Sequence, residues 1–414
     1  MTESPIPTLP TTARNSRTLL PWYACHFAVV FCYSMISNAV YFLCIYRLKV
    51  PASSTLWIAA GGGLIYTLAA YFSGRLVDRW GAKRVLMAAT ASCVLIFLTG
   101  ALAAYKNSLA LMAVVMFLLN ILTTPSWPAI ESALSRSPGT LRLGTRMMLY
   151  NLSWSSSTFI AFFLTGLCGE TLGWSTLFLV LGGCVLVILL MIAWWTIPQS
   201  MILKEHTADH AEDGAVPLEP TKAGTLLMMA WIANLFAYVS ANAIVPLMPA
   251  VTKGLGINNP GVATAIGSIF MLARVIGFVL AWLWIGWRYR IRWKLTFVTI
   301  MLVSTYFLII SQNISELVLL QIVLGLALAM IYSGSLYYAM HLSRGSGHNA
   351  GIHEAVIGVG TVLGPALAAM SGEAGALGPK ALTILVVQIC GLSILLGLAY
   401  RLKLRLGRKA AVTQ

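Results

Sequence analysis

The sequence predicts an all-α polytopic membrane protein with twelve transmembrane helices. The chain is 59% hydrophobic and only 9% charged, whereas soluble domains carry roughly 25% charged residues. Apolar runs of about 20 residues, the length that crosses a bilayer, occur roughly twelve times along the chain. The predicted spans begin near Trp22, Thr55, Val85, Ser108, Thr145, Trp174, Ala223, Pro260, Leu295, Ser315, Gly351 and Lys380.

The basic residues predict how these spans cross the membrane. The net charge of +15 does not indicate nucleic acid, because the basic residues lie in alternate loops instead of one soluble domain. With a cytoplasmic N-terminus, 21 of the 27 Lys and Arg residues fall inside, five fall outside and Arg274 lies in mid-span. The positive-inside rule therefore places both termini in the cytoplasm. We expect a multi-pass protein of the cytoplasmic (inner) membrane whose first helix is not cleaved.

A polar stretch near the middle of the chain predicts two halves. The predicted units are a cytoplasmic tail (1–21), a six-helix bundle (22–197), a linker (198–222), a second six-helix bundle (223–402) and a basic tail (403–414). A shift of 204 residues aligns Ser37–Val40 with Ala241–Ile244 and Arg84 with Arg288. Two pseudo-symmetric bundles in parallel orientation, related by an axis along the membrane normal, follow from this repeat.

A charged motif lies between the second and third predicted spans. It reads G-x-L-x-D-R-x-G-x-K-R and consists of Gly74, Leu76, Asp78, Arg79, Gly81, Lys83 and Arg84. Its charges must lie in water, so we expect a short loop there. The motif and its position resemble the signature loop of the major facilitator superfamily. This resemblance implies two bundles that rock around a central cavity and expose it to each side in turn.

The same resemblance implies a conformational latch. In that family the matching aspartate rests against the start of the eleventh helix when the cytoplasmic side is closed, and here that start is predicted near Gly351. A carboxylate is stabilised beside a helix N-terminus. Small residues in the motif would allow close approach, and the alternative is that the motif only sets the topology. The predicted latch residues are Gly74, Asp78, Arg79, Gly81 and Arg84.

Arg274 is the candidate for solute binding because it lies near the middle of the eighth predicted span. A charge there costs at least about 2.5 to 3.5 kcal/mol on insertion scales, so it needs a partner. No acidic residue is expected at its depth. Arg274 either holds an anionic group of the solute in the cavity or is a structural arginine buried between helices, and both readings stay open.

Polar and aromatic residues in mid-span are further candidates for a hydrated cavity. Asn234, Tyr238 and Asn242 are spaced four apart and are predicted to share one helical face. Singly, such residues also serve as hydrogen-bonded contacts between helices. The candidate set is Arg274, Tyr33, Asn38, Asn120, Asn151, Trp154, Asn234, Tyr238, Asn242 and Tyr332.

Three titratable residues are candidates for proton coupling. His353 and Glu354 fall just inside the eleventh predicted span, and Glu131 lies near the cytoplasmic end of the fourth. Burial disfavours the charged form of a carboxyl group, so such a residue can exchange a proton as a cavity opens and closes. Two alternatives remain: Glu354 in a first helical turn complements the helix dipole, and Glu131 forms a structural ion pair with Arg136.

These observations predict a secondary active transporter for a small organic solute, an anion or a zwitterion. No GxxxxGK[ST] loop is present, so an ion gradient of protons or sodium is expected to drive it. One alternative is a proton-coupled multidrug efflux antiporter, although the fifth span lacks the Gly-Pro motif of such families at 153–158. The other alternative is a non-transporting membrane sensor or scaffold.

Enzymatic activity and bound cofactors are not expected. The seven cysteines lie almost entirely in apolar runs without CxxC spacing. His353-Glu354 lacks the second histidine of a metalloprotease motif. The sequence therefore predicts no metal, no cofactor and no nucleic-acid partner, and we expect a monomer in the lipid bilayer.

Overall fold

The computed structural model describes residues 11–135, 143–194, 220–342 and 347–412, which form fourteen α-helices and no strand. Twelve helical segments in this part of the chain are long and apolar enough to cross a membrane. Each begins within four residues of its predicted start. The prediction of an all-α protein with twelve spans is therefore confirmed.

The first half of the chain supplies six of the spans. Its elements are α1 (Thr11–Phe42) with the π-helical turn η1 (Leu43–Arg47), α2 (Ala52–Trp80), α3 (Ala82–Lys106), α4 (Leu109–Thr123), α5 (Ser126–Ser135), α6 (Leu143–Leu172) and α7 (Trp174–Trp194). The fourth span consists of α4 and α5 together. They separate at Pro125, which has no N–H to donate and so interrupts the helical hydrogen bonds.

The second half supplies the other six. Its elements are α8 (Pro220–Gly254), α9 (Pro260–Gly267), α10 (Ile269–Leu283), the 3-10 turn η3 (Ile285–Trp287), α11 (Ile291–Ile309), α12 (Ile314–Leu342), α13 (Gly347–Met370) and α14 (Leu377–Val412). The eighth span consists of α9 and α10. Asn259 caps α9 by accepting a 2.8 Å hydrogen bond from the Val262 N–H, and Pro260 occupies the first turn.

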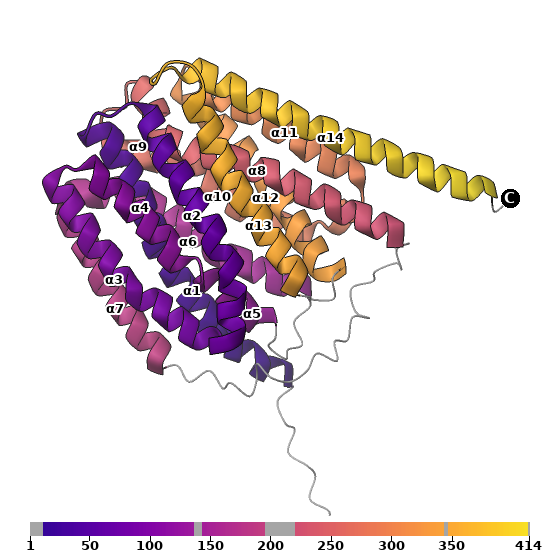
Figure 1. Ribbon diagram of the computed structural model, residues 1–414, viewed down its shortest axis with the longest axis horizontal. Coiled ribbons are helices and arrows are strands. Elements are labelled where there is room, and N and C mark those ends of the chain that lie inside the picture. The colour runs from indigo at the N-terminus through magenta and orange to yellow at the C-terminus, as the bar shows by residue number, and fades with distance from the viewer. Residues whose placement is uncertain (1–10, 136–142, 195–219, 343–346, 413–414) are drawn as a thin grey trace, which may run out of the picture.

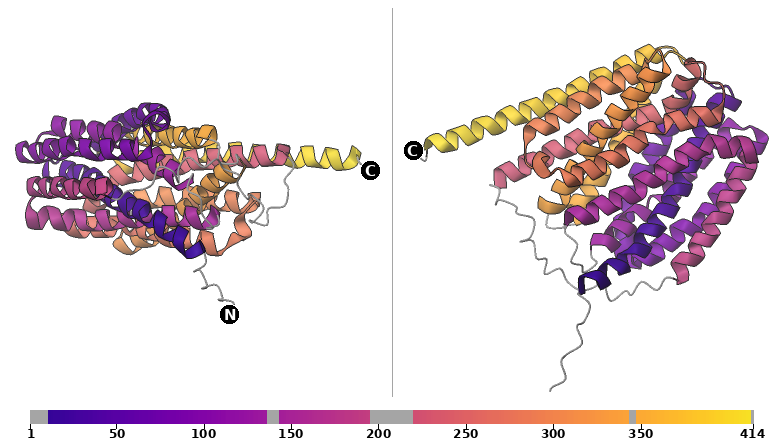
Figure 2. Two further views of the ribbon diagram at one scale, coloured as in Figure 1. Left: turned by 90° about the horizontal axis from the view of Figure 1, so that it is seen from below. Right: turned by 180° about the vertical axis from the view of Figure 1, so that it is seen from behind.

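The two halves lie side by side (Figure 1). One buried hydrophobic cluster belongs mainly to α1–α7 and a second mainly to α8–α14, as expected for two helical bundles. The start of α1 lies across the molecule from the turns that join α1 to α2 and α13 to α14 (Figures 1 and 2). An even number of spans brings the start of α1 and the end of α14 to the same side.

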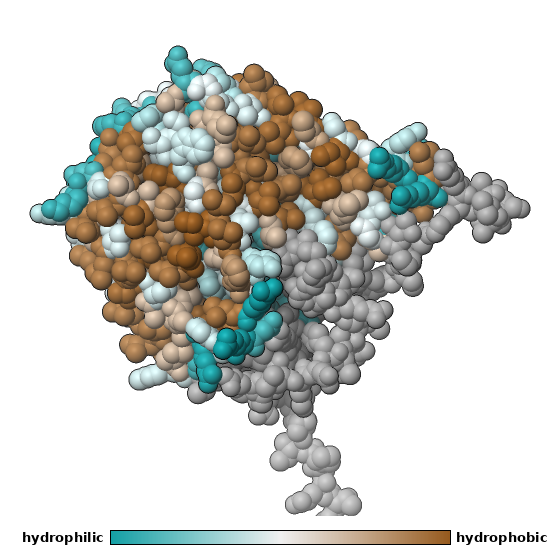
Figure 3. Space-filling model, viewed as in Figure 1, coloured by the Kyte–Doolittle hydropathy of each residue, from teal (hydrophilic) through white to brown (hydrophobic). Residues whose placement is uncertain are grey.

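The surface is that of a lipid-embedded protein. Figure 3 shows apolar residues over the middle of one face and hydrophilic residues at its rims. Large apolar side chains such as Leu68, Leu98, Leu190 and Leu382 are more than half exposed. Apolar exposure of this extent would be unfavourable in water and fits the hydrocarbon core of a bilayer.

The charged motif differs from its predicted loop. α2 continues through Trp80 and α3 begins at Ala82, so only Gly81 lies between them. Asp78 and Arg79 belong to the last turn of α2. Gly81 has a φ of +81°, a conformation that side chains other than glycine adopt with strain. Gly81 alone thus makes the sharp turn, and the charged residues that the sequence placed in a short loop lie in the adjoining helix ends.

Helices also extend into both predicted tails. α1 begins at Thr11, although the sequence predicted a tail up to residue 21. α14 continues to Val412, beyond the predicted boundary at 402, and its end projects from the bundle (Figure 2). A helix rises 1.5 Å per residue, so a 36-residue helix exceeds the roughly 30 Å hydrocarbon core.

Candidate solute-binding site

Arg274 lies in α10 among aromatic side chains. Its guanidinium carbon is 4.7 Å from the centroid of the Trp154 ring and 5.9 Å from those of Phe278 and Tyr332. The side chain is 5% exposed. Within the described residues no ion pair involves Arg274. Cation–π attraction therefore takes the place of a carboxylate in stabilising this buried charge.

These rings form one cluster, which we call the Arg274 cluster and define as Arg274, Trp154, Phe278, Tyr332 and Tyr238. Tyr332 is at its centre, with ring centroids 5.7 Å from Trp154, 5.9 Å from Phe278 and 6.2 Å from Tyr238. The Tyr238 hydroxyl interacts with the guanidinium. Trp154 comes from α6 and the other members from α8, α10 and α12, so the cluster lies between the two halves.

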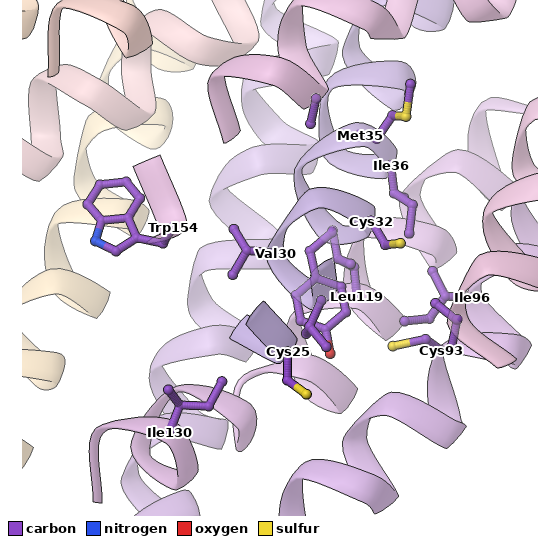
Figure 4. Packing of buried hydrophobic residues seen from close by; sticks show 14 of the residues in the cluster. Cys25, Val30, Cys32, Met35, Ile36, Cys93, Ile96, Leu119, Ile130 and Trp154 are labelled. Carbon is purple, nitrogen blue, oxygen red and sulfur yellow. The ribbon is translucent and has the colours of Figure 1, made fainter. Parts of the chain in front are cut away.

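Trp154 is the contribution of the first half to this cluster. Figure 4 shows its ring pointing away from the core residues Cys32, Ile36 and Cys93, toward the ribbons of the second half. Its indole N–H donates a 3.3 Å hydrogen bond to Oδ1 of Asn151, one turn earlier in α6. Asn151 is buried. Asn151 therefore contacts the cluster through Trp154 and fixes the orientation of the indole ring.

Buried polar atoms without partners mark this part of the molecule. Nε of Arg274 has no hydrogen-bond partner in the described part of the chain. The same holds for both amide atoms of Asn234, which is fully buried one turn before Tyr238 in α8. Leaving such a group unsatisfied costs about 1 to 3 kcal/mol. Buried polar groups of this kind are expected to meet water or a ligand.

Two glutamates form a second group, which we call the glutamate pair, Glu131 and Glu354. Glu354 in α13 accepts a 2.6 Å hydrogen bond from the hydroxyl of Tyr66 in α2. Glu131 in α5 accepts a 2.9 Å hydrogen bond from the hydroxyl of Tyr150 in α6. His353, which precedes Glu354, has its ring 5.6 Å from that of Tyr332, and Tyr150, which bonds Glu131, precedes Asn151 in α6. The glutamate pair therefore lies close to the Arg274 cluster, with one member on each half.

His353 does not join Glu354 as the sequence suggested. Neighbouring residues in a helix point about 100° apart. His353 accordingly turns toward α12, where its Nδ1 lies 3.1 Å from the Ser335 hydroxyl and its ring 5.6 Å from that of Tyr332. Glu354 turns toward α2. The two side chains therefore contact different helices, and a role of either in proton coupling stays a prediction.

The sequence left a structural role open for each glutamate, a helix-dipole role for Glu354 and an ion pair for Glu131. α13 begins at Gly347, so Glu354 lies about two turns inside the helix. The effect of the helix dipole falls off within the first turn, which excludes that role for Glu354. The proposed ion pair of Glu131 involves Arg136, which lies outside the described residues.

Four other candidates lie away from the cluster or bond only to backbone. Asn38 donates a 3.3 Å hydrogen bond to the Phe162 carbonyl and joins α1 to α6. Asn120 and Asn242 donate to carbonyls of their own helices, at 2.8 and 3.0 Å. Tyr33 is buried in the core of the first half. The Asn38 bond is of the interhelical kind that the sequence left as the alternative, whereas those of Asn120 and Asn242 stay within one helix.

The structure adds residues that the sequence did not single out. Tyr66 and Tyr150 bond the glutamate pair, and Phe278 belongs to the Arg274 cluster. His26 in α1 is fully buried, stacks on Tyr150 with centroids 4.9 Å apart, and has no partner for either ring nitrogen within the described residues. The signal available was that His26 is a titratable residue within an apolar run.

The two halves also meet at the helix ends on the side of the α1–α2 turn. The Tyr46 hydroxyl in η1 donates a 2.7 Å hydrogen bond to the Ile257 carbonyl after α8, and the Lys253 amine bonds the Ile45 carbonyl at 3.1 Å. Asn259 bonds the Glu170 carboxylate at 3.0 Å. These contacts close the molecule on the side of the α1–α2 turn.

The latch candidates lie at the other end of α2. Asp78, Arg79, Arg84 and Gly74 are exposed there. A Cβ atom built at Gly74 meets nothing within 4 Å, so close approach does not explain that glycine in this structure. α2 passes close to α13 nearer the middle of α2. A Cβ at Gly358 would lie 2.6 Å from the Thr67 hydroxyl, and a Cβ at Gly63 would lie 2.6 Å from the Thr361 carbonyl oxygen.

The described residues contain no group of three or more His, Cys, Asp or Glu side chains that would hold a metal ion. The Arg274 cluster instead offers a buried cation, flat aromatic surfaces and unsatisfied polar atoms. These are features of a site for a small organic molecule.

Comparison with known proteins agrees with the architecture. The nucleoside transporter NupG has a crystal structure that matches with a TM-score of 0.63 and 15% sequence identity, over 92% of this chain and 98% of that chain. The crystal structure of a NupG mutant matches with a TM-score of 0.64 and 15% sequence identity, over 92% of this chain and 99% of that chain. No curated protein matches the sequence. The model of the Major Facilitator Superfamily matches residues 22–228, half of the chain, and the protein therefore belongs to the major facilitator superfamily.

Proposed function

We propose that this protein is a secondary active transporter that moves a small organic anion or zwitterion across the cytoplasmic membrane by alternating access. The observation that carries the proposal is Arg274, a buried cation between the two halves that has no carboxylate partner in the described part of the chain. An anionic group of the solute would complete its interactions. Both termini then lie in the cytoplasm, as the distribution of basic residues favours.

The composition of the Arg274 cluster supports movement of one half against the other. Trp154 belongs to the first half, and Arg274 and Tyr332 belong to the second. Rocking of the halves would part Trp154 from Arg274 and expose the guanidinium. Binding across such an interface favours the conformation in which both halves contact the solute, which is how a ligand shifts a conformational equilibrium.

The motif at the end of α2 supports a latch on the cytoplasmic side. Thr67 meets Gly358 where α2 and α13 run antiparallel. Asp78 lies eleven residues further along α2, and eleven residues back along α13 is Gly347, its first residue. This register brings the Asp78 carboxylate level with the α13 N-terminus, where a negative charge is favoured. We propose that breaking this contact accompanies opening to the cytoplasm.

The glutamate pair supports proton coupling. Each carboxylate already accepts a hydrogen bond from a tyrosine, and in the described residues neither forms an ion pair. Two carboxylates close together in an enclosed site are costly when both are charged. We propose that Glu354, with Glu131, takes up a proton when the solute binds. Sodium would require several more oxygen ligands than this pair provides.

Substitution of Arg274 tests the proposed solute site. We expect Arg274→Gln to abolish uptake in proteoliposomes and Arg274→Lys to retain part of it, because lysine keeps the charge but loses the planar stacking. The uptake assay would use a solute that raises the melting temperature of the wild-type protein in a screen of organic acids. Arg290→Gln, at an exposed arginine after η3, is the control. Full uptake by Arg274→Gln would refute the proposal.

The dependence of solute binding on pH tests the proposed coupling. Protonation of the glutamate pair removes negative charge beside the site, so the affinity for an anion should rise as the pH falls. In Glu354→Gln this dependence should flatten and uptake should no longer respond to an imposed pH gradient. Calorimetric titrations over a pH series measure the first effect. An unchanged pH dependence in the variant would exclude Glu354 from coupling.

A further inference from the structure

We infer that the transported solute is a planar aromatic anion with a single negative charge, held by its charged group on Arg274 and by its ring between Trp154 and Tyr332. This inference rests on the proposed function and names the class of solute. It goes beyond the proposed function because it follows from the single positive charge and the flat aromatic rings of the Arg274 cluster.

The charges around the site select one negative group. Arg274 is the cation of the cluster, its Nε has no partner in the described part of the chain, and the Tyr238 hydroxyl is its polar neighbour. A carboxylate accepts hydrogen bonds from a guanidinium in a charge-assisted pair. A second negative charge on the solute would lie among aromatic rings near the glutamate pair without a cation to neutralise it. A cationic solute would be repelled by Arg274.

The walls of the site select a flat body. The indole of Trp154 lies over the guanidinium, and the rings of Trp154 and Tyr332 are in edge-to-face contact, 5.7 Å apart with a 65° angle between their planes. They can therefore receive a solute ring between them only when the two halves part. Phe278 closes the same cluster. Aromatic pairs in stacked or edge-to-face geometry are more favourable than burial of their area alone would make them. A ring that enters when the halves part can make such contacts, and a puckered saturated ring cannot make them as well.

The orientation of Trp154 is fixed by its own helix. The Asn151 amide holds the indole N–H, and Asn151 is buried, so the ring is preorganised at the face of the guanidinium. A preorganised wall loses little conformational entropy on binding. The ring of Trp154 is therefore positioned as a flat binding surface as well as a cover for Arg274.

Matched ligands test this inference on the purified full-length protein by isothermal titration calorimetry. Benzoate is the probe. Cyclohexanecarboxylate has the same charge without planarity, benzamide has the same ring without charge, and phthalate adds a second charge. We expect cyclohexanecarboxylate to bind roughly 3- to 10-fold more weakly than benzoate, and benzamide about 10-fold or more weakly. Phthalate should also bind more weakly than benzoate.

Two variants assign the preferences to residues. Trp154→Leu should reduce the preference for benzoate over cyclohexanecarboxylate while both acids still bind. Trp284→Leu removes an indole that packs edge-to-face against Trp293 outside the cluster. The preference of this variant for benzoate over cyclohexanecarboxylate should equal that of the wild type. Melting curves of the ligand-free variants check that both are folded.

The outcomes separate this inference from the proposed function. Equal affinity for benzoate and cyclohexanecarboxylate, with both lost in Arg274→Gln, would overturn the aromatic class and leave the anion transporter standing. Absence of benzoate binding, or a preference unchanged in Trp154→Leu, would also overturn the inference. Binding of benzoate that persists in Arg274→Gln would refute the proposed role of Arg274 itself, as would Arg274-independent binding of uridine, an uncharged nucleoside.

Discussion

At the scale of single residues, the structure explains how a charged side chain is accommodated inside the eighth span. Arg274 has no counter-ion among the described residues, and three aromatic rings lie within 6 Å of its guanidinium carbon. Each such contact contributes roughly 0.5 to 2 kcal/mol when desolvated. Together they offset a cost of at least about 2.5 to 3.5 kcal/mol for a central arginine. The aromatic rings thus stabilise the buried guanidinium, while its Nε still has no hydrogen-bond partner in the described part of the chain.

Asn151 belongs to this scale because it acts through Trp154. We expect Asn151→Ala to lower the affinity for the transported solute roughly 3- to 10-fold, since one hydrogen bond of about 1 kcal/mol that orients the indole is lost. Asn120→Ala is the matched control, because in the described part of the chain the Asn120 side-chain amide bonds only the Met116 carbonyl of its own helix. Calorimetry on both variants measures the effect. Equal losses in the two variants would remove the positioning role of Asn151.

At the scale of helices, α13 joins the two halves through small residues. Its Gly358 meets Thr67 of α2, and a Cβ atom at Gly364 would collide with the Val239 carbonyl oxygen of α8. Small residues allow helix backbones to approach closely in a membrane, where packing replaces the hydrophobic effect as the driving force. α13 is therefore placed to move with α8 and to slide along α2.

Gly364 provides the test at this scale. We expect Gly364→Ala to destabilise the protein by about 1 to 3 kcal/mol, because backbone of α8 must move away from the added methyl group. Gly183→Ala in α7 is the control, since its Cβ meets nothing within 4 Å and alanine favours the helix. Thermal unfolding in detergent measures both. A melting temperature for Gly364→Ala at or above that of Gly183→Ala would contradict the close packing of α8 and α13.

At the scale of the whole molecule, contacts between the halves occur at both ends and at the centre. Tyr46 and Lys253 join the outer ends, the Trp282 indole N–H bonds the Thr145 hydroxyl at 3.3 Å near the other end, and Glu354 bonds Tyr66 between them. Alternating access requires that the two ends open at different times. Among the described residues the end at the α1–α2 turn holds more of these bonds, because Thr55 also bonds the Pro246 carbonyl and the Gly166 N–H also bonds the Thr264 hydroxyl.

A crosslink at the outer end tests this motion. We expect oxidation of the double variant Ser53→Cys with Ala374→Cys to stop uptake, because the start of α2 and the turn after α13, whose backbones are joined by a 3.2 Å hydrogen bond, can no longer part. Reduction should restore it. The two single variants are the controls for oxidation of the native cysteines. Undiminished uptake by fully crosslinked protein would show that transport does not require separation of the halves at this end.

The positions of the spans could be predicted because a bilayer imposes its thickness on any sequence that crosses it. Every start agreed within four residues. The sequence did not show that α2 continues to Trp80, because charged residues such as Asp78 and Arg79 can extend a helix beyond the hydrocarbon. Arg274 was found because a charge in an apolar run is conspicuous. Its partners were found only in part: Phe278 looks like any lipid-facing residue in the sequence.

The sequence by itself determined the membrane class, the twelve spans and the two-half organisation, because hydropathy, length and charge act locally along the chain. Only the tertiary structure decided that Trp154 covers Arg274, that Tyr66 bonds Glu354 and that His353 turns away from its neighbour. These facts depend on how each helix is rotated and how segments distant in sequence align. The packing of the helices sets that rotation and alignment.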